Sequence, residues 1–286
     1  MTGHEPSGAE RLVRVDRIMG TTVSVHAIVA PRTRNDDEAL RAWFERCARG
    51  CFDELHEMDR VFSPYRADSE ISRLHEGTLT DAAADPLVSE VRLACARAEA
   101  ATEGRFSANW RGWFDPTGYV KGWAVERAHE HWLHPLLEAP GVLAVGVNAG
   151  GDMQLSTAED ADWDWRVGVA DPVGRGGLIA TVTIRNGAVA TSGLAERGAH
   201  ILDPRTGRAT TEALSATVIA DGLTEADVWA TSALVAGGEE FGWVERIPHT
   251  SGLLVTGDGR VRRWAGGIEV ATLTSPLAGL SPIALR

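Results

Sequence analysis

The stretch Asp115-Pro-Thr-Gly-Tyr-Val-Lys-Gly-Trp-Ala-Val-Glu-Arg127 predicts a tight turn that leads into a helix. Beyond the turn, apolar residues recur at every fourth position, at Val120, Ala124, Ala128 and Trp132. This spacing places one helix face against a core. A glycine-bearing turn at a helix start also favours a phosphate, and Lys121 and Arg127 add positive charge. An ordinary loop before an amphipathic helix explains the same residues, so the rest of the chain decides between the two.

The composition is that of a globular protein with an acidic balance. The 286 residues carry a formal net charge of −12, with 44% hydrophobic and 24% charged residues. A chain of this length forms one large domain or two small ones and can bury a sizeable core. The net charge argues against a nucleic-acid or anionic-membrane partner, so a phosphate site must gather its basic side chains locally.

Neither the N-terminus nor the cysteines indicate export. Residues 1–10 are polar and are expected to form a disordered tail, with neither the apolar run of a signal peptide nor a cysteine for lipid attachment. No window is long and apolar enough to span a bilayer. Cys47, Cys51 and Cys95 fit buried core thiols better than a disulfide framework. We therefore expect a cytoplasmic protein without a membrane anchor.

Helical patterns lie mainly in the first half of the chain. The longest covers 36–62, where apolar residues step by three or four and Asn35 or Asp36 can cap the helix. A short helical turn is expected over 68–73. Asp85 should cap a further helix, whose inward residues would be Val88, Val91, Cys95 and Ala98.

Strand patterns open the chain and dominate its second half. They are expected at 12–18, 23–29, 143–147, 165–171, 178–184, 188–193 and 217–220, with shorter pieces near Leu253, Val261 and Ile268. Asn186-Gly187 is a hairpin signal. One clear late helix covers 225–236, with Thr224 as its cap. The distribution predicts an α+β fold, with helices mainly in the first half and a mixed or antiparallel sheet mainly in the second.

Two groups of side chains could bind a metal. His129, His131 and His134 cluster, but their spacing differs from the i, i+4 geometry of zinc-binding helices. Asp227 and Thr231 stand four apart, so they share a helix face and offer a carboxylate and a hydroxyl, oxygens suited to magnesium. A solvated aspartate and a core threonine would explain this second pair equally well.

Two further motifs stand beside turns. Asn148-Ala-Gly-Gly-Asp152 is either a plain turn or a place where the backbone approaches a ligand closely. His200 precedes a D-P-x-T-G turn, and a lone histidine there is more often structural than catalytic. The sequence contains no P-loop, no H-E-x-x-H and no G-x-S-x-G.

Seven motifs occur together in one order along the chain. They are Met19-Gly-Thr21, Ser63-Pro-Tyr65 with Ser69-Glu-Ile-Ser72, Asp115-Pro-Thr-Gly-Tyr-Val-Lys-Gly122, Asn148-Ala-Gly-Gly-Asp152, Ala190-Thr-Ser-Gly193, His200-Ile-Leu-Asp-Pro204 and Ala226-Asp-Val-Trp-Ala-Thr231. In this order they resemble the FAD:protein FMN transferases, the ApbE-like family. The resemblance covers about residues 11–275 and implies one α+β domain over 11–286 after the tail at 1–10.

The resemblance implies a magnesium-dependent phosphoryl transfer. FAD would be split at its pyrophosphate, FMN would pass to a threonine hydroxyl of an acceptor protein, and AMP would leave. By matching position, the metal ligands would be the Asp227 carboxylate, the Thr231 hydroxyl and the Ala124 carbonyl. Flavin contacts would come from Met19, Tyr65, Lys121, Arg127 and Leu202, with Ser107, Ala108 and Asn109 near the nucleotide. His200 would be the catalytic base, beside Asp227 as the catalytic carboxylate.

The residue chemistry is consistent with this reaction, and other reactions stay open. Phosphoryl transfer needs positioning and a cation on the oxygens that carry charge. Ala230 stands where relatives often carry a second acidic residue, which implies one carboxylate fewer on the metal. The alternatives are an FAD pyrophosphatase that gives FMN and AMP, and a non-catalytic FAD-binding protein. Family acceptors carry a motif resembling Asp-Gly/Ala-x-Ser/Thr-Gly-Ala-Thr, which this chain lacks, so the acceptor is expected in trans.

Overall fold

The N-terminal hairpin forms as its alternating apolar residues predict. The computed structural model describes residues 2–3, 8–173, 176–194, 201–239, 241–270 and 283–284. In it, β2 (Glu10–Ile18) and β3 (Thr21–Val29) pair antiparallel along their whole length. Met19 and Gly20 form the turn with φ of 52° and 72°. Positive φ is easy for glycine but uncommon for methionine, so this turn is strongly constrained at Met19.

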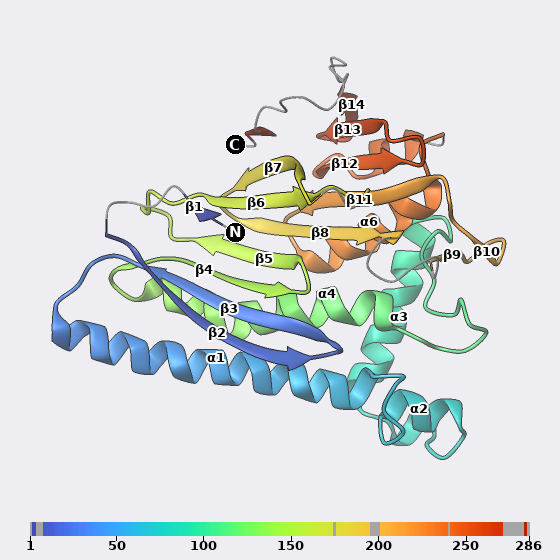
Figure 1. Cartoon of the computed structure of the whole chain (residues 1–286). Coiled ribbons are helices and arrows are strands. Elements are labelled where there is room, and N and C mark those ends of the chain that lie inside the picture. Colours follow the sequence, from blue (N-terminus) through green and yellow to red (C-terminus); the bar gives the residue numbers. More distant parts are fainter. Residues whose placement is uncertain are drawn as a thin grey trace.

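Nine of the described strands form one antiparallel sheet, in the order β14-β13-β12-β11-β8-β5-β4-β3-β2 (Figure 1). Its other members are β4 (Val142–Ala149), β5 (Asp152–Thr157), β8 (Gly187–Gly193), β11 (Ala213–Ala220), β12 (Ser251–Thr256), β13 (Val261–Ala265) and β14 (Ile268–Val270). Most neighbours are joined by hairpins, but β8 returns from a second sheet to pair with β5. This crossover brings distant parts of the chain together at the centre of the sheet.

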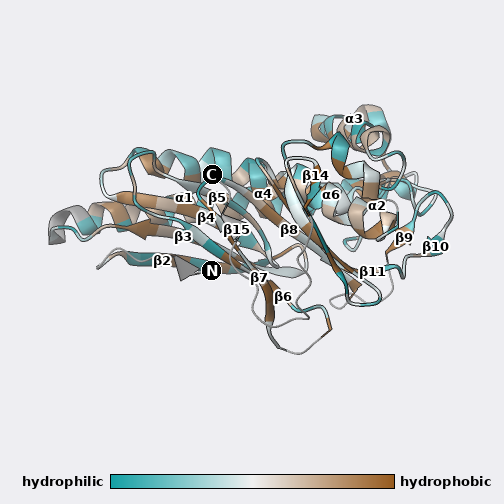
Figure 2. Cartoon of the chain, turned by 90° about the horizontal axis from the view of Figure 1, so that it is seen from above, coloured by the Kyte–Doolittle hydropathy of each residue, from teal (hydrophilic) through white to brown (hydrophobic). Residues whose placement is uncertain are grey.

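Helices cover one face of this sheet (Figures 1 and 2). Those packed against its strands are α1 (Arg34–Phe62), α4 (Thr117–Ala128) and α6 (Leu223–Ala236). The helices α2 (Glu70–His75) and α3 (Pro86–Ala101) lie toward one end of this layer, and 3-10 segments are found at Asp81–Ala83, His134–Glu138 and Phe241–Arg246. The apolar faces of α1, α4 and α6 and the facing strands share one core, which includes Phe44, Leu55, Ala124 and Leu234. Nearly every residue of α6 is buried, so this helix is the most enclosed.

A smaller sheet covers the opposite face. It contains β1 (Thr2–Gly3), β6 (Trp165–Ala170), β7 (Leu178–Ile184) and β15 (Ile283–Ala284), and β15 pairs parallel with β7. A second core lies between the sheets, where the Trp163 and Trp165 rings meet edge to face at 5.7 Å between centroids. The two-stranded hairpin β9 (Leu202–Asp203) and β10 (Arg208–Ala209) stands apart.

The α+β fold class is confirmed, with helices mostly in the first half and antiparallel sheet mostly in the second. Two predicted helix caps are wrong. The N-cap of α1 is Thr33 rather than Asn35 or Asp36, because the helix begins at Arg34. The N-cap of α6 is Gly222, and Thr224 lies inside the first turn.

The predicted apolar stripe of the central helix ends early. Val120, Ala124 and Ala128 are buried, but Trp132 is 38% exposed. After Ala128 the helix widens into a π-helical segment, His129–Leu133, in which the His134 amide donates to the His129 carbonyl. The wider turn advances fewer degrees per residue, so Trp132 is rotated off the stripe.

Within the described part of the chain, no helix combines the length and apolar character that crossing a bilayer requires. The division into a tail at 1–10 and a domain at 11–286 stays a prediction.

Acid should weaken the fold through His26. This β3 side chain is 8% exposed, and burial lowers the pKa of its imidazole to about 4 from 6.5. Between these values the unfolded chain binds the proton and the folded chain does not. The full stability is therefore present above pH 6.5 and is lost as the pH falls toward 4, by about 3 kcal/mol for this shift.

The comparison is urea unfolding of the wild type and His26→Gln at pH 7, 5.5 and 4.5. The variant should show a shallower loss of unfolding free energy over this range. Burial also lowers the pKa of His129, which is present in both proteins. The unfolding free energy of the variant should therefore still fall somewhat with pH. Equal slopes would contradict the assignment to His26.

Candidate active site

Antiparallel pairing brings several predicted segments to one end of the large sheet. The β2–β3 turn and the β4–β5 turn lie at the same end, because β3 and β4 pair between them. The Gly150 amide donates to the Thr22 carbonyl at 3.0 Å. β8 also ends there, at Gly193, because it runs antiparallel to β5. Figure 1 shows the end of α1 and the β9–β10 hairpin on the same side.

On the helical face of the sheet, α4 and α6 approach each other closely at Gly122. A Cβ on Gly122 would stand 2.8 Å from the Leu223 carbonyl oxygen and 3.1 Å from Asp227 Cβ. Both distances are shorter than an ordinary carbon contact, so a side chain there would push the helices apart. The absence of a side chain at Gly122 lets the residues beside it on α4 reach the buried face of α6.

Lys121 lies between two carboxylates at this contact. Its Nζ forms an ion pair with Asp152, the first residue of β5, and stands 3.4 Å from Asp227 Oδ2 on α6. The lysine side chain is 23% exposed and each carboxylate 5%. Asp152 is held in place by the Thr191 amide, which donates to its Oδ1 at 2.9 Å. Three elements thus converge on one buried cluster of charges.

A hydroxyl of β8 extends the cluster. Thr231 Oγ1 and Ser192 Oγ are 3.0 Å apart on the helical face of the sheet, whereas Thr191 Oγ1 and Thr217 Oγ1, 2.9 Å apart, lie on the opposite face. Thr231 follows Asp227 by one helical turn, so the carboxylate and this hydroxyl line the same side of α6. The structure therefore places Lys121 beside Asp227, and Thr231 one helical turn from Asp227.

The chemistry of these donors fits magnesium. The ion prefers carboxylate and hydroxyl oxygens, and it often uses one or two carboxylates together with substrate phosphates. Asp227 and Thr231 supply such oxygens, with Asp152 nearby. In the described ranges no three His, Cys, Asp or Glu side chains group closely enough to hold a metal alone. Ala124 carries the least support, because α4 continues through Ala128 and its carbonyl has a regular partner within the helix.

Arg127 lies on a different face of α4. It follows Lys121 by six residues, which is a rotation of about 120° around an α-helix. Its Nε donates to Glu54 Oε1 of α1 at 2.8 Å. Glu54 also bonds His131 Nδ1 at 3.0 Å and accepts from Trp132 Nε1 at 2.9 Å. The structure therefore joins Arg127 to α1 and does not bring it together with Lys121.

The chain's own carboxylate occupies the predicted anion position at the start of α4. Asp115 Oδ1 accepts hydrogen bonds from the Thr117 amide at 3.2 Å and the Thr117 hydroxyl at 2.7 Å. Asp115 is buried, and its Oδ2 stands 3.4 Å from Arg111. The helix start at Thr117 is thus satisfied by the carboxylate of Asp115. The positive charge of Lys121 lies one helical turn further along α4.

The residues predicted near the nucleotide form a loop tied to this helix start. Ser107 Oγ bonds Glu99 Oε2 at 3.1 Å and accepts from the Asn109 amide at 3.1 Å. Ala108 is buried, and its carbonyl accepts from the Asp115 amide at 2.7 Å. Residues 107–109 are therefore ordered by the protein itself.

The residues predicted to contact the flavin differ in exposure. Tyr65 is 83% exposed in the loop after α1, whereas Met19 packs partly against the main core. Leu202 is half-buried in β9, beside Asp203. The pKa of the Asp203 carboxyl is lowered by its hydrogen bond from Arg205, which also fixes the D-P-x-T-G turn. The candidate base, His200, lies outside the described residues.

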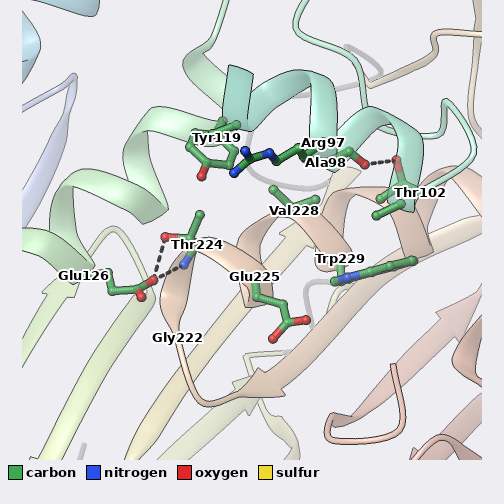
Figure 3. Close-up of a pocket in the computed structure, with 12 residues that line it drawn as sticks. Arg97, Ala98, Thr102, Tyr119, Glu126, Gly222, Thr224, Glu225, Val228 and Trp229 are labelled. Carbon is green, nitrogen blue, oxygen red and sulfur yellow. Dashed lines mark hydrogen bonds between the residues drawn. The ribbon is translucent and has the colours of Figure 1, made fainter. Parts of the chain in front are cut away.

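Two of the hollows formed by the described residues lie on the helical side. One, of about 450 Å³, is an open pocket between α3, α4 and α6 and is lined by residues that include Tyr119, Glu126 and Trp229 (Figure 3). The other, of about 510 Å³, lies between α2, α3 and the tryptophan-rich link, where the His75 and Trp113 rings stack at 4.3 Å. None of the predicted flavin or metal residues lines either cavity.

Asp152 and Ser192 belong to the site, although sequence reasoning did not select them. Both stand in quoted motifs, Asn148-Ala-Gly-Gly-Asp152 and Ala190-Thr-Ser-Gly193. The available signal was their position, since each lies at the end of a strand next to a glycine. Their partners, Lys121 and Thr231, follow only from the order of strands and helices in space.

The model of the ApbE family matches residues 19–112 and 108–253. A Rhodobacter capsulatus protein named FAD:protein FMN transferase is 33% identical over 160 residues, which are 51% of this chain and 29% of that protein. The Escherichia coli K12 protein of the same name is 31% identical over 137 residues, 44% of this chain and 39% of its own length. The matched regions thus span only about 29 to 39% of these relatives.

Solved structures share the fold over most of the chain. The ApbE protein of Thermotoga maritima superposes with a TM-score of 0.72 at 22% identity and covers 89% of this chain and 97% of its own. The flavin transferase ApbE of Vibrio cholerae gives a TM-score of 0.66 at 21% identity, with 90% and 97% covered.

Gly122→Ala should destabilise the protein, although alanine normally favours a helix by about 1 kcal/mol over glycine. The added Cβ meets the Leu223 carbonyl, so the free energy of unfolding should fall by about 1–3 kcal/mol. Gly242→Ala is the matched control, because a Cβ there meets nothing within 4 Å. Chemical unfolding of both variants tests this, and a Gly122→Ala protein as stable as the wild type would refute the tight contact.

Proposed function

Because the chain belongs to the ApbE family, we propose that it transfers FMN from FAD to a threonine hydroxyl of an acceptor protein, in a magnesium-dependent reaction that releases AMP. The observation that carries the proposal is the buried cluster in which Lys121 lies between Asp152 and Asp227, one helical turn from Thr231. The names of the relatives from Rhodobacter capsulatus and Escherichia coli support the same activity.

The proposed reaction is a single displacement at phosphorus. The acceptor oxygen forms a bond to the FMN phosphorus, the bond from that phosphorus to the bridging oxygen breaks, and AMP leaves with the bridging oxygen. Asp227 and Thr231 would hold Mg²⁺, with the Ala124 carbonyl as a third ligand from the resemblance. When bound, the ion would neutralise charge that develops on the phosphate oxygens.

The chain's own groups would position the pyrophosphate. Lys121 is the cation at the cluster, and its two carboxylate partners fix where its ammonium lies. Ser192 would orient the Thr231 hydroxyl through their 3.0 Å contact. His200 is proposed as the base that takes the proton of the acceptor hydroxyl, since neutral imidazole accepts a proton near neutral pH.

The flavin would lie at the end of the sheet where the turns gather. Met19, Tyr65 and Leu202 are proposed contacts there, with residues 107–109 near the nucleotide. Arg127 would have to exchange Glu54 for the flavin phosphate to take the same part. The acceptor is proposed to act in trans, because the sequence lacks the acceptor motif.

The direct test is incubation with FAD and Mg²⁺, with and without a peptide carrying the acceptor motif. We expect AMP together with covalently flavinylated peptide. AMP with free FMN would instead indicate a pyrophosphatase, and intact FAD would indicate a binding protein. Either of these results would refute the transferase proposal.

Asp227→Asn should lower turnover by about 10²–10³-fold, the scale for loss of one electrostatic stabiliser of a transition state. The substitution keeps the size of the side chain and removes its charge, so FAD binding should persist in part. Asp221→Asn, an exposed carboxylate just before α6, is the control and should turn over normally. Steady-state rates across a magnesium titration decide the matter, and a wild-type magnesium dependence in Asp227→Asn would move the metal elsewhere.

A further inference from the structure

A carboxylate from α4 caps the start of α6. Glu126 Oε2 accepts hydrogen bonds from the Thr224 amide at 2.8 Å and the Thr224 hydroxyl at 2.6 Å (Figure 3). The N-cap of α6 is Gly222, which has no side chain to satisfy the first amides of the helix. A Cβ on Gly222 would stand 2.7 Å from a Glu126 carboxylate oxygen, so the carboxylate lies directly against the helix start.

Each of the two helices carries one residue of this cap and one residue of the candidate site. Glu126 follows Lys121 by five residues on α4, and Thr224 precedes Asp227 by three on α6. The Gly122 contact with Leu223 and Asp227 lies between them. Both capping residues thus stand within about one helical turn of the place where α4 and α6 touch.

A side chain of β5 also hydrogen-bonds the start of α6. The Leu223 amide donates to Gln154 Oε1 at 2.8 Å, and Gln154 Nε2 donates to the Asp221 carbonyl at 3.1 Å. Gln154 is two residues after Asp152 on β5, so both point to the same face of the sheet. Glu126 of α4 and Gln154 of β5 thus both hydrogen-bond the N-terminus of α6. The same two elements carry Lys121 and Asp152 of the charged cluster.

We propose that Glu126 is a positioning residue for the site: by holding the α6 N-terminus, it sets the place of Asp227 relative to Lys121 and so the affinity for the metal. The effect on metal affinity rests on the metal site proposed above, and the effect on turnover rests also on the proposed reaction. Loss of a group that orients a metal ligand typically costs 10–100-fold in metal affinity or activity. A cap that served stability alone would leave both unchanged.

The test compares Glu126→Ala with Asp85→Ala. Asp85 is the N-cap residue of α3 itself, accepts a bond from the Leu87 amide at 2.9 Å, and lies outside the site. Both variants lose one helix cap, so both should unfold at a lower temperature. Glu126→Gln keeps the size and one acceptor oxygen, so it should give intermediate values. It also replaces Glu126→Ala should that protein fail to fold.

Three quantities are measured for each protein: the melting temperature, the affinity for Mn²⁺ alone by electron paramagnetic resonance, and kcat and KM with FAD over a magnesium titration. Glu126→Ala should bind Mn²⁺ about 10-fold more weakly and lose about 10–100-fold in kcat, with KM for FAD nearly unchanged. Asp85→Ala should match the wild type in Mn²⁺ affinity and in kcat.

The outcomes separate the two proposals. Weaker Mn²⁺ binding in Glu126→Ala, in a protein whose wild type does not turn over FAD, would support the positioning role and refute the proposed function. Normal Mn²⁺ affinity and kcat in Glu126→Ala, with the same loss of stability as Asp85→Ala, would overturn the positioning role alone. A wild type that neither binds Mn²⁺ nor turns over FAD would overturn both.

Discussion

At Gly122, α4 approaches α6 so closely that a Cβ would stand 2.8 Å from the Leu223 carbonyl oxygen. Helix axes separated by ordinary side chains lie 8–10 Å apart, and glycine at the crossing permits the near end of that range. The short side chain of Asp227 then reaches Lys121 at 3.4 Å. The charged cluster depends on this contact. The contact brings Asp227 of α6 to Lys121 of α4, while the end of the sheet supplies Asp152 from β5.

Burying Lys121 with two carboxylates is costly unless each group has a partner. Removing one member of a buried ion pair leaves a charge with little solvation, which destabilises more than the pair itself stabilises. Here the Thr191 amide supports Asp152, and the 29-residue helix α1 and the large sheet keep the surroundings rigid. The fold thus holds a polar cluster at a position where apolar residues would pack more favourably. Such local conflicts are typical of functional sites.

Local patterns predicted the elements, and long-range contacts decided the site. The periodicity of α1 and the alternation of β3 are properties of consecutive residues, so the sequence suffices for them. Asp227 and Thr231 were predicted as a pair because one helical turn separates them. The bond between Glu126 and Thr224 joins residues 98 apart, and no local pattern contains it. For the same reason the sequence predicts Thr224 itself as the cap of α6, whereas the capping oxygen comes from Glu126 of α4.

The distribution of charge favours a metal between the protein and a phosphate. Glu54 engages Arg127, and the Asp115 carboxylate fills the start of α4 at Thr117. Of the basic residues predicted for the flavin phosphates, Lys121 is therefore the one kept at the cluster, where two carboxylates outnumber it. In a chain of net charge −12, a pyrophosphate placed directly against these carboxylates would be repelled. A divalent cation held by Asp227, as proposed, would reverse that sign, so phosphate binding at this site would depend on metal binding.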